Sequence, residues 1–138
     1  MQFFGIDLAF GSANPSGLYV LDERGASVES SYLYSDQSIV DFVAQCADTI
    51  GNVLVIDAPL VCTNETGQRT SEKLIGRHYG RFHASCHSSN TKNMAGQRGP
   101  RLLAELRGKL PIFVRYDARA ASSGMWPVIE KRTHIRAT

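Results

Sequence analysis

An unbroken apolar run, Val53–Ile56, is the feature that most constrains how this chain folds, and it ends on an acidic residue, Asp57. A strand with one wet face alternates apolar and polar residues, whereas a continuous apolar run is typical of a strand covered on both faces in a parallel sheet. Pro59 follows and ends the strand, because proline cannot donate to the ladder of hydrogen bonds. We therefore expect an α/β fold with helices on the faces of a sheet.

The segments before this run predict three strands joined by short turns. Residues 2–8 and 17–21 are rich in apolar and aromatic side chains, 27–34 form a weaker third strand, and turn-forming residues separate them. Short connections of this kind join antiparallel neighbours. A helix is expected from an N-cap at Asp36 to about Ile50, and a right-handed crossover through it brings the next strand parallel to the first.

The remaining segments predict two further helices and one more strand. Apolar spacing indicates a helix near 70–75 and another from Pro100 to Leu110, with a polar loop over 80–99 between them. An apolar segment at 111–116 is expected to be the last strand. The length of 138 residues suits one domain with an ordinary apolar core. The predicted order is therefore β-β-β-α-β-α-α-β around a mixed sheet.

Charge is distributed unevenly, although the formal net charge is only +2. Residues 1–68 hold nine acids and one base, whereas residues 69–109 hold nine bases and two acids. A basic segment of this kind favours an anionic partner, and the phosphate backbone of nucleic acid is the usual candidate. A normally solvated surface explains the same charges, so both interpretations stay open at this point.

The cysteines and the hydropathy indicate the cellular compartment of the protein. Cys46, Cys62 and Cys86 are odd in number and form no close pair, which argues against a disulfide framework and suits a reducing cytosol. No apolar run approaches the roughly 20 residues that a membrane-spanning helix needs. We expect a cytoplasmic protein without a membrane partner.

Two aspartates end strands that are predicted to be neighbours. Asp7 ends the first strand and Asp57 the fourth, and a right-handed crossover sets these strands side by side and parallel. Both carboxylates then emerge at the carboxyl edge of the sheet, where α/β proteins usually bind ligands. Two adjacent anions repel each other, and a hard cation such as Mg²⁺ or Mn²⁺ relieves the repulsion. The pattern favours a metal site over two aspartates that merely cap turns.

Four other polar residues in or next to the basic segment are candidate site residues, and each also has an interpretation without a functional role. Glu72 lies in the first turn of a predicted helix, a position that the helix dipole favours for an acid whatever its role. Asn64 and Arg69 lie in the loop that leaves Asp57, so their donors can face a phosphate or simply stabilise a solvated turn. His83 is either a proton donor or phosphate contact, or a surface histidine without a role.

The chain combines the motifs Phe4–Gly11, Ile56–Leu60, Asn64, Gly67–Arg69, Glu72, Gly80–Ala84 and Arg98–Leu102. In combination, they resemble the domain-of-unknown-function 429 family over about residues 2–110. Its members are predicted nucleases with a ribonuclease-H-like fold, in which three antiparallel strands are followed by parallel strands. The resemblance implies that Asp7, Asp57 and Glu72 form the acidic site, and that Arg69, His83 and Arg101 are its neighbours.

The expected function is that of a metal-dependent phosphodiester hydrolase acting on nucleic acid. In two-metal-ion catalysis one ion activates a water while the other stabilises the leaving oxygen. Asp7 would bridge two Mg²⁺ or Mn²⁺ ions, and Asp57 and Glu72 would each hold one. Two alternatives stay open: a sugar-kinase/actin-like phosphotransferase, which shares the strand–hairpin start, and a degenerate nucleic-acid-binding module that no longer turns over.

The end of the chain departs from the family pattern. Family members continue into a last helix with a further carboxylate, whereas apolar periodicity is lost here after Tyr116. We expect a ribonuclease-H-like domain over 1–116, truncated at its C-terminal side, and an irregular tail over 117–138. A sheet surface left uncovered by a missing helix would favour self-association, and a metal site short of one ligand would make the chain a poor catalyst.

Overall fold

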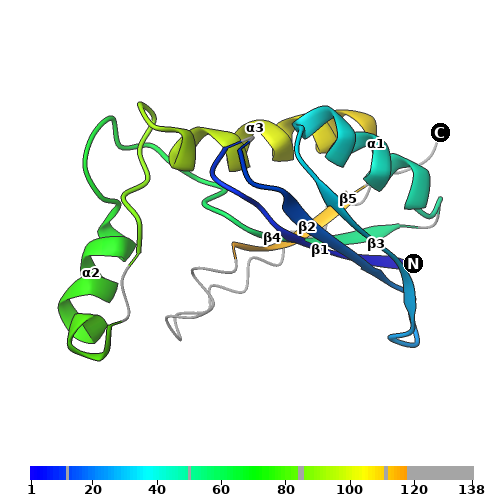
Figure 1. The fold of residues 1–138 in the computed structure, drawn as a ribbon, viewed down its shortest axis with the longest axis horizontal. Helices are drawn as coiled ribbons and strands as arrows, with labels where there is room; N and C mark the ends of the chain where they lie inside the picture. Colours follow the sequence, from blue (N-terminus) through cyan, green and yellow to red (C-terminus); the bar gives the residue numbers. More distant parts are fainter. Residues whose placement is uncertain (12, 50, 84–85, 111, 118–138) are drawn as a thin grey trace, which may run out of the picture.

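The computed structural model describes residues 1–117 except 12, 50, 84, 85 and 111. Within these residues the chain forms one mixed sheet of five strands in the order β3-β2-β1-β4-β5 (Figure 1). The strands are β1 (Gln2–Asp7), β2 (Ser16–Leu21), β3 (Ser27–Leu33), β4 (Asn52–Asp57) and β5 (Ile112–Asp117). The helices are α1 (Asp36–Cys46), α2 (Thr70–Tyr79), the 3₁₀ helix η1 (Gly80–Phe82) and α3 (Met94–Lys109).

The pairing of the strands confirms the predicted mixed α/β sheet. β1 pairs with β2 and β2 with β3 in antiparallel register, whereas β1 pairs with β4 and β4 with β5 in parallel register. The helix α1 supplies the crossover from β3 to β4, so that β4 inserts beside β1. The first and fourth strands are therefore neighbours that run in the same direction.

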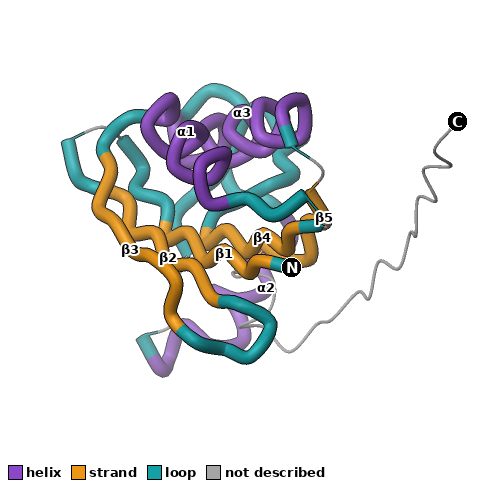
Figure 2. Tube along the Cα trace, turned by 90° about the vertical axis from the view of Figure 1, so that its right-hand side faces the viewer, coloured by secondary structure: helices purple, strands orange, loops and turns teal. Residues whose placement is uncertain are grey.

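Helices α1 and α3 both lie on one face of the sheet (Figures 1 and 2). The residues of β4 alternate accordingly: Leu54 and Ile56 are fully buried against these helices, whereas Val53 and Val55 on the opposite face are only half-buried. The prediction that this strand is covered on both faces is therefore wrong for the described part of the chain. An apolar residue can also occupy a position that is only partly buried. Val53 and Val55 are such residues, on the face of β4 that α1 and α3 do not cover.

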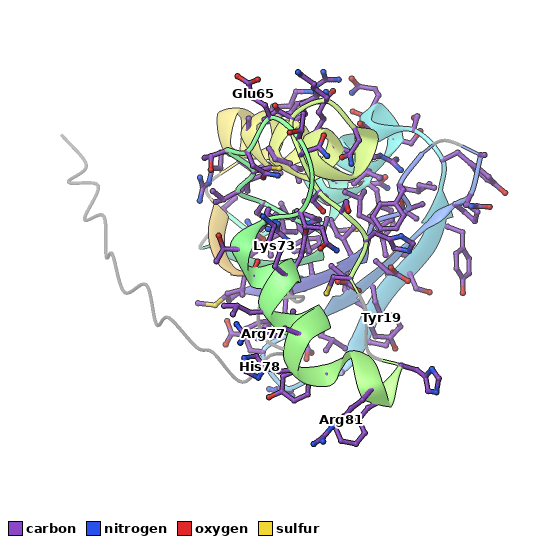
Figure 3. The ribbon with its side chains drawn as sticks, turned by 90° about the vertical axis from the view of Figure 1, so that its left-hand side faces the viewer. Tyr19, Glu65, Lys73, Arg77, His78 and Arg81 are labelled. Carbon is purple, nitrogen blue, oxygen red and sulfur yellow. The ribbon has the colours of Figure 1, made fainter. Side chains whose placement is uncertain are left out.

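Helix α2 projects away from the two layers. It lies beyond the carboxyl ends of β1 and β4, on the side of the sheet opposite α1 and α3 (Figures 1 and 2). Its basic residues Lys73 and Arg77 are exposed, and so is Arg81 in the following η1 (Figure 3). Among the described residues, no helix has the length and apolar character needed to cross a bilayer.

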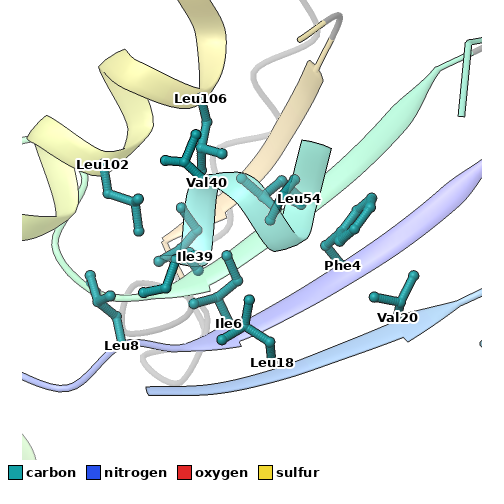
Figure 4. Packing of buried hydrophobic residues seen from close by; sticks show 13 residues of the cluster. Phe4, Ile6, Leu8, Leu18, Val20, Ile39, Val40, Leu54, Leu102 and Leu106 are labelled. Atoms are coloured by element: carbon teal, nitrogen blue, oxygen red, sulfur yellow. The ribbon is translucent and has the colours of Figure 1, made fainter. Parts of the chain in front are cut away.

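The core fills the space between the sheet and the α1–α3 layer (Figure 4). Alternate residues of β1 and β2 enter it, because successive side chains of a strand point to opposite faces. Burying such a side chain contributes roughly 1.5–3 kcal/mol relative to leaving it in water. The buried apolar cluster consists of Phe4, Ile6, Leu8, Leu18, Val20, Ile39, Val40, Val43, Leu54, Ile56, Ala58, Leu102 and Leu106.

The first residues of α1 and α3 differ from the prediction, because in each helix a polar N-cap residue fixes where the helix begins. Ser35, not Asp36, is the N-cap of α1, because its hydroxyl accepts a hydrogen bond from the amide of Ser38 at 3.0 Å. Helix α3 begins at Met94, inside the segment predicted to be a loop. Its cap is Asn93, whose Oδ1 accepts from the amide of Gly96 at 2.9 Å. The last strand was predicted correctly to within one residue. The predicted irregular tail over 117–138 is wrong for Asp117, which ends β5, and the rest of it lies outside the described residues.

Candidate functional site

The two aspartates at the strand ends lie directly opposite each other. Asp7 and Asp57 are the last residues of β1 and β4 and are Cα partners in the parallel register. Neighbouring strands lie about 4.8 Å apart, and paired residues project to the same face. That face is the one opposite Phe4 and Ile6, so both carboxylates are exposed on the open side of the sheet. The predicted meeting of these two strand ends is confirmed.

The two carboxylates line a hollow of about 590 Å³ on this open face. Its floor contains Gly17, the residue of β2 that pairs with Asp7. A Cβ built on Gly17 would lie 3.7 Å from Cε1 of Tyr32 and 4.0 Å from Cβ of Asp7. The aromatic ring and the aspartate therefore flank the same glycine. Tyr19, from the middle of β2, lines the hollow as well.

Arg98 of α3 ties the loop after Asp7 to the rest of the domain. Its guanidinium is only 5% exposed and donates to the carbonyl oxygens of Ala9 and Gly11, which follow β1. The same group donates to the carbonyl oxygen of Tyr34 and to Oδ1 of Asp36, at the start of α1. Arginine suits this position because its planar fork carries five donors. One buried side chain of α3 thus contacts both the segment after Asp7 and the start of α1.

Gly99 performs the corresponding role for the loop after Asp57. A Cβ on Gly99 would lie 2.4 Å from the carbonyl oxygen of Pro59 and 3.2 Å from Cβ of Ala58. Only glycine lets α3 approach the backbone this closely. Arg98 and Gly99 are adjacent in sequence, so one turn of α3 contacts the segments that follow both aspartates. Sequence reasoning missed these two residues, although the glycine of the Arg98–Leu102 motif signalled a close backbone approach.

Glu72 belongs to a separate polar cluster at the start of α2. Its side chain is 2% exposed and accepts hydrogen bonds from the amide and Nε of Arg69 and from the amide of Ser89, at 2.9, 2.9 and 3.1 Å. Burial alone would raise the pKa of Glu72, but the hydrogen bonds from Ser89 and Arg69 outweigh it and hold the pKa below its ordinary value. The ionised carboxylate therefore fastens α2 to the loop before α3.

Asn64 strengthens the same cluster from the loop after β4. Its Nδ2 lies within hydrogen-bond distance of the carbonyl oxygens of Thr66, Gly67 and Ser89, at 3.1 to 3.2 Å. Arg69 also donates to the carbonyl oxygen of Val61 at 3.2 Å. The side-chain amide of Asn64 is thus directed at the protein's own backbone, which is the arrangement of a clamped loop.

The two remaining predicted site residues lie on other elements. His83 is exposed, follows η1 at the far end of α2, and has a left-handed backbone with φ of 59°. Arg101 is exposed on α3 and donates to Oε1 of Gln97 at 2.8 Å. The structure thus brings together Asp7 with Asp57, and separately Asn64, Arg69 and Glu72. Within the described part of the chain, no group of three His, Cys, Asp or Glu side chains is placed to hold a metal ion.

The fold and the pair of strand-end carboxylates define an α/β protein with an acidic site at the carboxyl edge of its sheet. The family model described as a protein of unknown function, DUF429, matches residues 5–110, so the chain belongs to this family. A comparison with curated proteins gave no match.

One solved structure with some likeness is the cytoplasmic domain of EpsL, an inner-membrane component of the type II secretion system of Vibrio cholerae. The two chains are 15% identical, with a TM-score of 0.41 over 83% of this chain. This chain spans 56% of the length of that structure.

Proposed function

We propose that this chain is a metal-dependent phosphodiester hydrolase of ribonuclease-H-like fold that acts on nucleic acid. The observation that carries the proposal is the register of β1 and β4, in which Asp7 and Asp57 are partners at the carboxyl ends of parallel strands. Strand order supports the fold assignment, because an antiparallel set, β3-β2-β1, is followed by the parallel strands β4 and β5. Membership of the DUF429 family is consistent with it.

The pair of aspartates fits one hydrated Mg²⁺ or Mn²⁺ ion. Hard cations take oxygen ligands, and Mg²⁺ usually keeps several waters while one or two carboxylates and substrate phosphates complete its shell. Asp7 and Asp57 supply those two carboxylates on an open face with room for a phosphate. Glu72 does not fit as a third ligand in this conformation, because Arg69 and Ser89 already engage both of its oxygens.

The residues of the chain would divide the work as follows. Asp7 and Asp57 would bind the cation, which when bound supplies positive charge at the phosphoryl group and a more acidic water. Arg98 and Gly99 would hold the loops after the two aspartates in place, through the contacts with Ala9 and Pro59. The exposed bases of α2 would attract phosphates of the backbone without reading sequence.

The test is a cleavage assay with Mn²⁺ on labelled single- and double-stranded oligonucleotides, comparing wild type with Asp57→Asn. We expect metal-dependent cleavage that Asp57→Asn abolishes. Asp41→Asn is the matched control, because Asp41 is an exposed acid on α1 that accepts a hydrogen bond from Nε2 of Gln37. Cleavage that survives Asp57→Asn and needs no metal would reject the proposal.

A second candidate is a nucleic-acid-binding module without turnover. It is favoured by the hydrogen bonds that Glu72 accepts from Arg69 and Ser89. With Glu72 held there, the metal site at the strand ends has two carboxylates rather than the three expected for the hydrolase. Salt-dependent binding of oligonucleotides without any metal-dependent cleavage would support this candidate over the hydrolase.

A further inference from the structure

The open face of the sheet carries an aromatic residue that the core does not use. Tyr32 of β3 is 78% exposed, yet its ring is held beside Gly17, with Cε1 3.7 Å from the position of a Cβ there. The glycine leaves room for the ring to lie across the neighbouring strand. A large aromatic ring that lies against the sheet on one side and is open to water on the other can serve as a stacking platform.

The platform lies next to the acidic pair. Gly17 is the pairing partner of both Tyr32 on β3 and Asp7 on β1, and Asp57 follows on the next strand. The order across the sheet is therefore ring, glycine, carboxylate, carboxylate. A planar group stacked on Tyr32 would be within the reach of one nucleotide from a phosphate held at the aspartates.

The other lining residues suit a nucleobase. Gly5 and Gly17 keep the floor free of side chains, and Ser30, which shares the open face with Tyr32, brings a hydroxyl that can bond to the polar edge of a base. Tyr19, 48% exposed, adds a second aromatic ring. The volume of about 590 Å³ lies within the range of small-molecule sites.

Charge beyond the pocket indicates a strand rather than an isolated base. Exposed Lys73 and Arg77 are one helical turn apart on α2, and Arg81 follows in η1, beyond the carboxyl ends of β1 and β4 (Figures 1 and 3). A positively charged track beside stacking rings is how proteins bind single strands without sequence preference. In a duplex each base is already stacked on its neighbours and must be unpaired first.

We infer that this hollow binds a base of single-stranded nucleic acid, stacked on Tyr32, with the adjoining phosphate held through a divalent cation at the Asp7–Asp57 pair. The inference rests on the proposed function and names its substrate as single-stranded. It makes Tyr32 a residue that selects unpaired nucleotides, and it makes binding depend on the bases as well as on the phosphates.

The test measures binding of the full chain, in Mg²⁺, to a fluorescent dT12, to an abasic oligonucleotide of equal length, and to a hairpin duplex. Gels check that each oligonucleotide stays intact. We expect dT12 to bind tightest, and Tyr32→Leu to weaken that binding about tenfold while leaving abasic binding unchanged. Tyr34→Leu is the matched control, because Tyr34 is 56% exposed and is not among the residues that line the hollow.

Each other outcome overturns the inference in a recognisable way. Equal binding of dT12 and the abasic chain, or no effect of Tyr32→Leu, would remove base stacking and leave a metal-dependent hydrolase intact. Tighter binding of the duplex would reverse the substrate class. A change in sedimentation with Tyr32→Leu, without a change in dT12 binding, would assign the face to a second copy of the chain. Mn²⁺ binding without nucleic acid tests the proposed metal site separately.

Discussion

Arg98 and Asp36 are 62 residues apart in the chain, and Nε of one donates to Oδ1 of the other at 2.7 Å. The arginine is nearly fully buried, and its other donors reach the carbonyl oxygens of Ala9, Gly11 and Tyr34. One side chain therefore fixes the ends of β1 and β3 and the start of α1 against α3. The contact thus links α3 to the segment that directly follows Asp7.

We expect Arg98→Ala to lower the free energy of unfolding by about 3 kcal/mol. Breaking one partner of a buried ion pair typically costs about 3–5 kcal/mol, and the exposure of Asp36 places this pair at the lower end. Urea denaturation measures the change. Arg101→Ala is the control on the same helix, and its exposed side chain should matter by less than about 0.5 kcal/mol. Equal losses for the two variants would show that the contacts of Arg98 contribute little.

Two glycines of α3 should respond to alanine with opposite signs. Gly99→Ala places a methyl group 2.4 Å from the carbonyl oxygen of Pro59, so the helix or the loop after Asp57 must move, at a cost of about 1–3 kcal/mol. Gly108→Ala meets no atom within 4 Å and should stabilise the helix by about 0.5–1 kcal/mol. Thermal unfolding of both variants checks the prediction, and a stabilised Gly99→Ala would contradict the packing described.

The stability of the domain should fall in acid partly because of Glu72. Its pKa is lowered in the folded state, so its contribution is present above the ordinary value of 4.5 and is lost as the pH falls through the folded value. Glu72→Gln should cost about 2 kcal/mol at pH 7, since it weakens hydrogen bonds to a charged group. The free energy of unfolding of the Glu72→Gln variant should also vary less between pH 6 and pH 3 than that of wild type.

The control for this titration is Glu65→Gln. Glu65 is 81% exposed and lies 3.7 Å from Lys92, so the substitution should leave the acid dependence of unfolding nearly unchanged. If Glu72→Gln retains the full acid dependence of wild type, the hydrogen bonds from Ser89 and Arg69 are not what holds this carboxylate ionised.

Local patterns sufficed to predict the strands and the meeting of Asp7 with Asp57. The apolar and aromatic content of β1 and β2, the apolar run of β4 and the handedness of the crossover each depend on a few neighbouring residues or on a general rule. The start of α3 was missed, because a single cap, Asn93, extends the helix into a polar segment without apolar periodicity.

The composition of the site was harder to predict, because it depends on contacts between distant segments. From the sequence, Glu72 is a candidate metal ligand. The structure shows that it accepts a hydrogen bond from the amide of Ser89, 17 residues later, and no local pattern predicts that contact. The sequence around Arg98 gives it the character of one more surface base, since nothing nearby shows that carbonyl oxygens of two distant segments accept from it. Resemblance to a family names such positions but does not say what each side chain touches.

The most direct measurement of the central claim is a titration of the protein with Mn²⁺, following the free ion by electron paramagnetic resonance. Wild type and the control Asp41→Asn should bind the ion with equal affinity. Asp7→Asn and Asp57→Asn should each weaken binding at least tenfold, since removal of a ligand costs no less than loss of its supporting contacts. Equal binding by wild type, Asp7→Asn and Asp57→Asn, or no binding by any of them, would contradict the account.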